Sequence, residues 1–184
     1  PESEFHRARL SVDDIVEEWS ELIEELLETR PNAKLVFTIS PVRHWKDGAH
    51  ENQVSKSVLH LAIDMLEKRF EEHVSYFPAY ELMMDELRDY RYYADDMLHP
   101  SSVAVEYIWE RFSDTFFSDE TRKINAQWNR IRKSIEHRPL HPNNESYYRF
   151  LEETLQRMEA FVQEYPSISC DEEREDLLED RIHL

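Results

Sequence analysis

The scarcity of glycine constrains this chain more than any other feature of its sequence. Gly48 is the only glycine in 184 residues, whereas average usage of about 7% would give roughly a dozen. Phosphate-binding and dinucleotide-binding loops need several glycines within one short turn. Loops of that kind are therefore absent. The count favours a mostly helical chain, or the later part of a domain whose glycine-rich opening lies elsewhere.

Charge and apolar content narrow the set of partners. The formal net charge is −18 at pH 7, which opposes binding to nucleic acid or to an anionic membrane surface, because both are negatively charged. No apolar run approaches the roughly 20 residues of a membrane-spanning helix. Cys170 is the only cysteine, so an internal disulfide is excluded and the redox compartment stays undecided. Since no signal peptide is visible, we expect a cytoplasmic rather than a secreted protein.

The first part of the chain has the pattern of an α/β domain. A helix is expected from the N-cap Ser11 to the stop at Pro31, followed by a short buried strand at 34–39. A second helix at 52–72 and a second strand at 74–77 continue the pattern. The near-continuous apolar character of the first strand suits a parallel sheet.

Two apolar stripes should face the core of this part. In the first helix the stripe consists of Ile15, Trp19, Leu22, Ile23, Leu26 and Leu27. In the second helix it consists of Val54, Val58, Leu59, Leu61, Ala62, Met65, Leu66 and Phe70. A helix that leads by a short loop into a buried strand implies an αβ unit.

The later part of the chain is expected to be helical throughout. Helices are predicted at 102–116, 119–137 and 145–165, and a further helix in the acidic tail after Asp171. We expect the second and third of these to form an antiparallel pair, because the connection between them contains two prolines. If their stripes are not buried within one chain, a homo-oligomer through this helical extension must bury them. The predicted domains are therefore 1–117 and 118–184.

An Asp-x-x-His-Pro turn, from Asp96 to Pro100, is the candidate catalytic element. A carboxylate three residues before an imidazole can fold back and accept its N–H, which is the orienting role of the acid in a nucleophile–His–Asp triad. Ser101 and Ser102 follow and can cap a new helix. The alternative is a satisfied turn without chemistry, because this spacing also arises by chance.

Arg43 and His44 are the candidate substrate-binding residues. They lie on the loop that leaves the carboxyl end of the first strand, where open α/β sheets bind ligands. The two residues can contact an anionic group, or they can pair with nearby acids. Ser40 on the same loop lacks a Gly-x-Ser-x-Gly elbow and is followed by Pro41, so it is a poor nucleophile candidate.

Neither a metal nor a cofactor is expected. Nine histidines are present, but there is no His-Glu-x-x-His motif and a single cysteine cannot build a cysteine-rich site. His137 and His141 lie four residues apart on either side of Pro139, so they cannot share a regular helical face.

Five sequence blocks, in order, resemble the GSCFA-domain proteins. They are EFHR at 4–7 with Leu10; FTISPVRH at 37–44 with Asp47, Gly48, Asn52, Ser55 and Lys56; FPAYE at 77–81; DELRDYR at 85–91; and DMLHPS at 96–101. The resemblance extends from the start of the chain to about Leu140. It implies an SGNH (GDSL-like) hydrolase, a three-layer α/β/α sandwich with a serine on its first block and an Asp-x-x-His on its last.

By this resemblance Asp96 and His99 are the acid and base of an ester hydrolase, whose substrates include acylated carbohydrates. The Gly-Ser-Cys-Phe-Ala block with its serine is absent from these 184 residues. We therefore expect the carboxyl-terminal portion of such a domain: a partial α/β/α sandwich with few short parallel strands and a helical extension, helix-dominated overall. Activity of this chain alone is left open. The alternative function is a non-catalytic acidic helical module for interaction or scaffolding.

Overall fold

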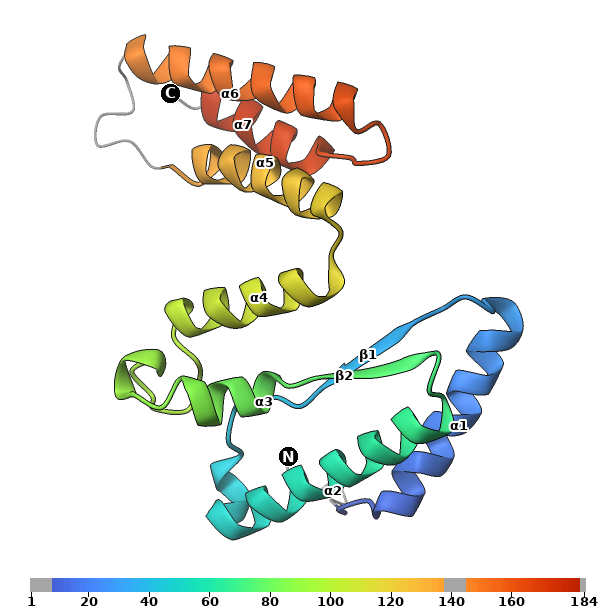
Figure 1. Cartoon of the computed structure of the whole chain (residues 1–184). Coiled ribbons are helices and arrows are strands. Elements are labelled where there is room, and N and C mark those ends of the chain that lie inside the picture. Colours follow the sequence, from blue (N-terminus) through green and yellow to red (C-terminus); the bar gives the residue numbers. More distant parts are fainter. Residues whose placement is uncertain (1–7, 138–144, 183–184) are drawn as a thin grey trace. The chain divides into compact units, whose positions relative to one another are not determined.

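The structure is a computed structural model that describes residues 8–137 and 145–182 (Figure 1). The chain divides into two compact units, Pro1–Phe112 and Ser113–Leu184, which we describe one at a time. The described residues form two short parallel strands and otherwise helices, so the helix-dominated α/β class is confirmed. A domain boundary at residue 117 stays a prediction. No helix in the described ranges is long and apolar enough to cross a membrane.

Helix α1, Val12–Thr29, begins with a capping box. The Ser11 hydroxyl accepts the Asp14 N–H at 3.2 Å, and the Asp14 carboxylate accepts the Ser11 N–H at 2.8 Å. The buried stripe differs from the predicted one. Val16, Ser20 and Ile23 are buried, whereas Trp19 and Leu22 are 37% and 53% exposed. The rings of Trp19 and Phe37 pack edge to face, with their centroids 4.8 Å apart.

Strands β1, Leu35–Thr38, and β2, Val74–Phe77, pair in parallel, with Leu35 opposite Val74 and Thr38 opposite Phe77. Helices α1 and α2 supply the core on one face of this sheet. That core contains Val16, Ile23, Ala62, Leu66 and Val74. On the other face Phe77 meets the ring of Phe112 edge to face, with centroids 5.1 Å apart. The sheet is thus contacted on both sides within the first unit.

Helix α2, Gly48–Arg69, begins earlier than the predicted Asn52, because a 3-10 turn, η2 (Trp45–Asp47), leads directly into it. Gly48 has a φ of +82°, in the left-handed region that favours glycine. The predicted stripe of α2 is partly wrong. Leu59, Leu61 and Met65 are 38%, 57% and 43% exposed, whereas Ile63 is buried.

The segment after β2 carries the candidate catalytic turn. Helix α3, Ala79–Glu81, continues into a π-helical turn, η3 (Leu82–Glu86), and a 3-10 turn follows, η4 (Tyr90–Tyr92). Helix α4, Ser102–Phe116, begins after the turn. A small core joins these elements, with Met83, Leu87 and Ala104 buried at its centre and Met84, Tyr92, Tyr93, Tyr107 and Ile108 packed against it.

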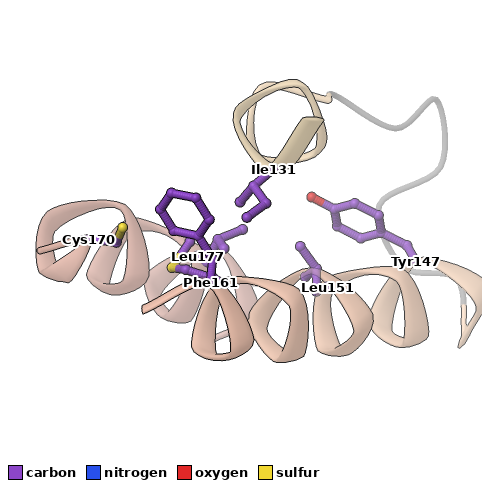
Figure 2. Packing of buried hydrophobic residues seen from close by; sticks show 7 residues of the cluster. Ile131, Tyr147, Leu151, Phe161, Cys170 and Leu177 are labelled. Atoms are coloured by element: carbon purple, nitrogen blue, oxygen red, sulfur yellow. The ribbon is translucent and has the colours of Figure 1, made fainter. Parts of the chain in front are cut away.

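The second unit consists of α5, Asp119–Ile135, α6, Glu145–Glu164, and α7, Asp171–Ile182. The ring centroids of Trp128 and Phe161 lie 5.5 Å apart, and those of His137 and Phe150 lie 5.4 Å apart. Because the earlier aromatic residue of the first segment meets the later one of the second, α5 and α6 run antiparallel, as predicted. Figure 2 shows Ile131 pointing from α5 toward α6, the helix that carries Leu151 and Phe161. In the described residues beyond Ser102 all regular structure is helical, as expected.

Helix α7 completes this core. Leu177 and Cys170 are 1% and 4% exposed and belong to the same cluster as Ile131 and Leu151. The stripes of α5 and α6 are therefore buried within one chain, so they do not require a second copy. The homo-oligomer stays a prediction. His141, considered above with His137, lies outside the described residues.

Candidate functional site

Asp96 and His99 are in direct contact within a tight turn. One carboxylate oxygen of Asp96, Oδ1, accepts the backbone N–H groups of Leu98 and His99, both at 2.9 Å. The other oxygen, Oδ2, lies 2.5 Å from Nδ1 of the His99 ring. The three-residue spacing therefore gives the geometry expected from the sequence. The two side chains remain accessible, with 48% of Asp96 and 62% of His99 exposed.

Backbone hydrogen bonds between the two ends of this turn hold its conformation. Tyr93 and Pro100 form an antiparallel bridge, and the Ala94 N–H donates to the His99 carbonyl at 2.8 Å. The Met97 N–H donates to the Ala94 carbonyl at 2.9 Å. Because Tyr93 packs against the core of Met83, Leu87 and Ala104, the turn is anchored to the first unit.

The helix start predicted after Pro100 is present. Helix α4 begins at Ser102, and the Ser101 hydroxyl accepts the Ala104 N–H at 3.4 Å. The Ser101 N–H donates to the Tyr92 carbonyl at 2.8 Å, which ties the helix start to the far side of the loop. His99 therefore has a fixed backbone on both sides.

The turn keeps Asp96 ionised. The backbone N–H of His99, then that of Leu98, then the His99 ring lower the pKa of Asp96 to about 2. The Asp96 carboxylate is consequently charged at neutral pH and accepts a hydrogen bond from Nδ1–H of His99. In the neutral imidazole, Nε2 is then the nitrogen that lacks a proton.

We expect this turn to lose stability in acid. The folded pKa of Asp96, about 2, lies below the ordinary value of about 3.9, so the carboxylate contributes stability above pH 4 that is lost as the pH falls toward 2. A carbon-13 NMR titration of the Asp96 carboxyl should give a midpoint near 2, and the protection of the Leu98 and His99 amides, relative to their intrinsic exchange rates at each pH, should fall over the same interval. A midpoint near 4 would contradict the hydrogen bonds.

The loop between β1 and α2 carries Arg43 and His44. The His44 N–H donates to Oδ1 of Asn52 at 2.8 Å, and Nδ1 of its ring lies 3.1 Å from the Asp47 carboxylate. His44 thus has the nearby acid that we considered as the alternative to a substrate. The Arg43 guanidinium instead lies 3.7 Å from the sulfur of Met84.

Sequence reasoning missed two residues that organise this loop. Asn52, which is 4% exposed, accepts the His44 N–H, and the Lys56 ammonium donates to the Ser40 carbonyl. Both residues lie on α2 at positions i and i+4, so they share one helix face. Asn52 and Lys56 belong to the same sequence block as Arg43, and this is the signal by which they could have been identified.

Arg43 and the Asp96–His99 pair are linked through one small core. Met84, which contacts Arg43, packs against the cluster that also includes Tyr92 and Tyr93. Within residues 8–137 and 145–182, however, no hydrogen bond or ion pair joins Arg43 or His44 to His99. A shared groove for the four candidate residues stays a prediction.

No group of three or more His, Cys, Asp or Glu side chains in the described part of the chain is arranged to hold a metal ion.

Comparison with known proteins identifies the family. Residues 1–112 match the GSCFA family, and residues 128–182 match the GSCFA domain protein C-terminal domain. The chain therefore belongs to the GSCFA family, as its sequence blocks indicated. No curated protein and no solved structure gives a match.

The first of these matches ends at residue 112, where the first compact unit also ends. The second match lies wholly within the second unit. In this chain the two matches therefore fall in the two units that the structure separates, and both candidate site elements belong to the first unit.

Proposed function

We propose that Asp96 and His99 are the acid and base of an SGNH-type ester hydrolase. The single observation that carries this proposal is the 2.5 Å contact between Oδ2 of Asp96 and Nδ1 of His99. The nucleophile would be the serine of the Gly-Ser-Cys-Phe-Ala block, which these 184 residues do not contain.

In the proposed mechanism, Nε2 of His99 takes the proton of the serine hydroxyl as its oxygen attacks the ester carbonyl. The Asp96 carboxylate stabilises the imidazolium that forms and holds the ring in one orientation. His99 then gives the proton to the departing alcohol, and water hydrolyses the acyl-enzyme with His99 again as base. The exposure of the His99 side chain, 62%, leaves Nε2 reachable by a serine from another segment.

Arg43 and His44 are proposed to bind the substrate. Their loop follows the carboxyl end of β1, the edge of a parallel sheet at which ligands bind. The side chain of Asn52 fixes the backbone of this loop through the His44 N–H. We propose esters, including acylated carbohydrates, as the substrate class.

The chain alone should hydrolyse p-nitrophenyl acetate no faster than buffer, because a base without a nucleophile has nothing to activate. Joining the Gly-Ser-Cys-Phe-Ala segment of a family member ahead of residue 1 should produce turnover that depends on that serine. The measurement is the release of p-nitrophenol from both polypeptides under identical conditions.

Ser40 supplies the control for this experiment. Its hydroxyl accepts the Val42 N–H at 3.2 Å, and Ser40→Ala should leave the rate unchanged in both polypeptides. If the chain alone shows turnover that survives Ser40→Ala and disappears with His99→Ala, an unrecognised nucleophile is present. If the joined polypeptide is inactive toward all esters tested, the non-catalytic interaction module becomes the better account of the chain.

A further inference from the structure

Two cations near the carboxyl end of β1 have unusual partners. The chain carries 40 acidic against 22 basic residues, and several of its described cations pair with carboxylates. On the same α2 helix, Lys68 contacts Asp64 at 2.7 Å and Arg69 contacts Glu24 at 2.9 Å. Lys56 instead donates to the Ser40 carbonyl, and Arg43 lies against the Met84 sulfur.

The positive charges of Lys56 and Arg43 also act on each other. Partial burial and the positive charge of Arg43 both lower the pKa of Lys56, and no carboxylate opposes these two causes. Within residues 8–137 and 145–182, neither cation forms an ion pair with an acid. Two half-buried like charges repel each other, and an anion bound between them would relieve that repulsion.

The local structure is arranged in advance for such an anion. Asn52 and Lys56, one helical turn apart, hold the backbone of the loop at His44 and Ser40. Arg43, between these two fixed points, presents a planar fork of N–H groups, and Lys56 adds a point charge. This combination suits the oxygens of a carboxylate, sulfate or phosphate group.

We propose that Lys56 and Arg43 together bind an oxyanion at the carboxyl end of β1. This site extends the proposed function and rests on it, because the bound anion is taken to be part of the ester substrate. Esters that also carry a negatively charged group would then be the preferred substrates. In a molecule of net charge −18, an anionic substrate needs a local positive site, because the overall field repels it.

The test is an amide NMR titration of the 184-residue chain with sodium sulfate, with ionic strength held constant by sodium chloride. We expect saturable shifts of the amide signals of residues 40–47. A charge-assisted contact is worth about 1.5–3 kcal/mol, so Arg43→Met and Lys56→Met should each weaken sulfate binding by about tenfold or more. A parallel titration with sodium acetate distinguishes a preference for carboxylate from one for sulfate or phosphate.

Matched controls come from the same helix. Lys68→Met and Arg69→Met remove the same charges at positions paired with acids, and both should bind sulfate within about twofold of the unchanged chain. Because Lys56→Met also removes the bond to the Ser40 carbonyl, Lys56→Arg and Arg43→Lys serve as charge-keeping variants that should retain most of the affinity. The amide spectrum reports whether each variant is folded, and Arg43→Gln replaces Arg43→Met if that variant is not.

Linear shifts that do not saturate, or Arg43→Met binding as tightly as the unchanged chain, would overturn the oxyanion site. Equal losses in the Lys68 and Arg69 controls would do so as well, because they would indicate a general charge effect. Binding is measured without turnover. Hydrolysis is measured in the polypeptide that contains the serine block. Ester hydrolysis by that polypeptide, without sulfate binding by the 184-residue chain, therefore rejects this site alone. Sulfate binding, without hydrolysis by the polypeptide that contains the serine block, rejects the proposed function alone.

Discussion

His99→Ala should reduce ester hydrolysis by at least about a thousandfold in the polypeptide that contains the serine block, because loss of the base leaves the serine hydroxyl protonated. Asp96→Asn should cost about ten-thousandfold, as expected when an amide replaces the carboxylate that orients the imidazole. An Asn side-chain amide can donate toward Nδ1, which favours the tautomer with a proton on Nε2. The measurement is kcat for a p-nitrophenyl ester.

His60 provides the control for these variants. Its ring also faces a carboxylate, with Nδ1 at 3.5 Å from Glu81, and it packs edge to face against Tyr76 and Tyr80. His60→Gln should leave kcat within about threefold. A His99→Ala polypeptide that retains a tenth of the activity would remove His99 from the mechanism, even if Asp96→Asn is inactive.

Leu177→Ala should destabilise the second unit by about 2–5 kcal/mol, because it opens a cavity in a packed core. Leu177 is 1% exposed and lies in the cluster that Figure 2 shows, with Ile131 and Phe161. The adjacent residue, Leu178, is 36% exposed, so Leu178→Ala should change stability by no more than about 0.5 kcal/mol. Urea unfolding followed by amide NMR signals of α5 and α6 measures both variants.

This pair of variants also tests the role of α7. If Leu177→Ala and Leu178→Ala have equal, small effects, the α5–α6 hairpin is stable without the third helix. If Leu177→Ala lowers the urea midpoint of signals in α5, the three helices unfold as one cooperative unit. The same result predicts that a 118–166 peptide, which lacks α7, is less helical than residues 113–184.

Sequence periodicity located most elements of this fold but not the buried face of each helix. Helix α1 carries apolar residues on more than one face, and its packing partner decides which of them is buried. Val16, which packs with α2 and the sheet, is buried, and so is Ser20, whereas Leu22 stays 53% exposed. Ser20 carries no apolar signal, so no stripe drawn from hydrophobicity alone could include it.

The geometry of the Asp96–His99 turn was predictable because its contacts are local. Asp96 contacts Leu98 two residues and His99 three residues further along the chain, and Pro100 with Ser101 marks the helix that follows. The proposed anion site depends instead on contacts between residues distant in the sequence, such as Arg43 with Met84. Periodicity carries no information about such pairs. Met84 itself lies in the π-helical turn at Leu82–Glu86.

The backbone at Met97 affects how the Asp-x-x-His motif can vary during evolution. Met97 has a φ of 60°, the only positive φ of a non-glycine residue in the described ranges. This conformation costs an L-residue about 1–2 kcal/mol, and it costs glycine or asparagine less. The cost is highest for β-branched residues such as valine or isoleucine. The first variable position of the motif is therefore not freely interchangeable. A search for distant homologues should reward Gly and Asn there and penalise Val, Ile and Thr.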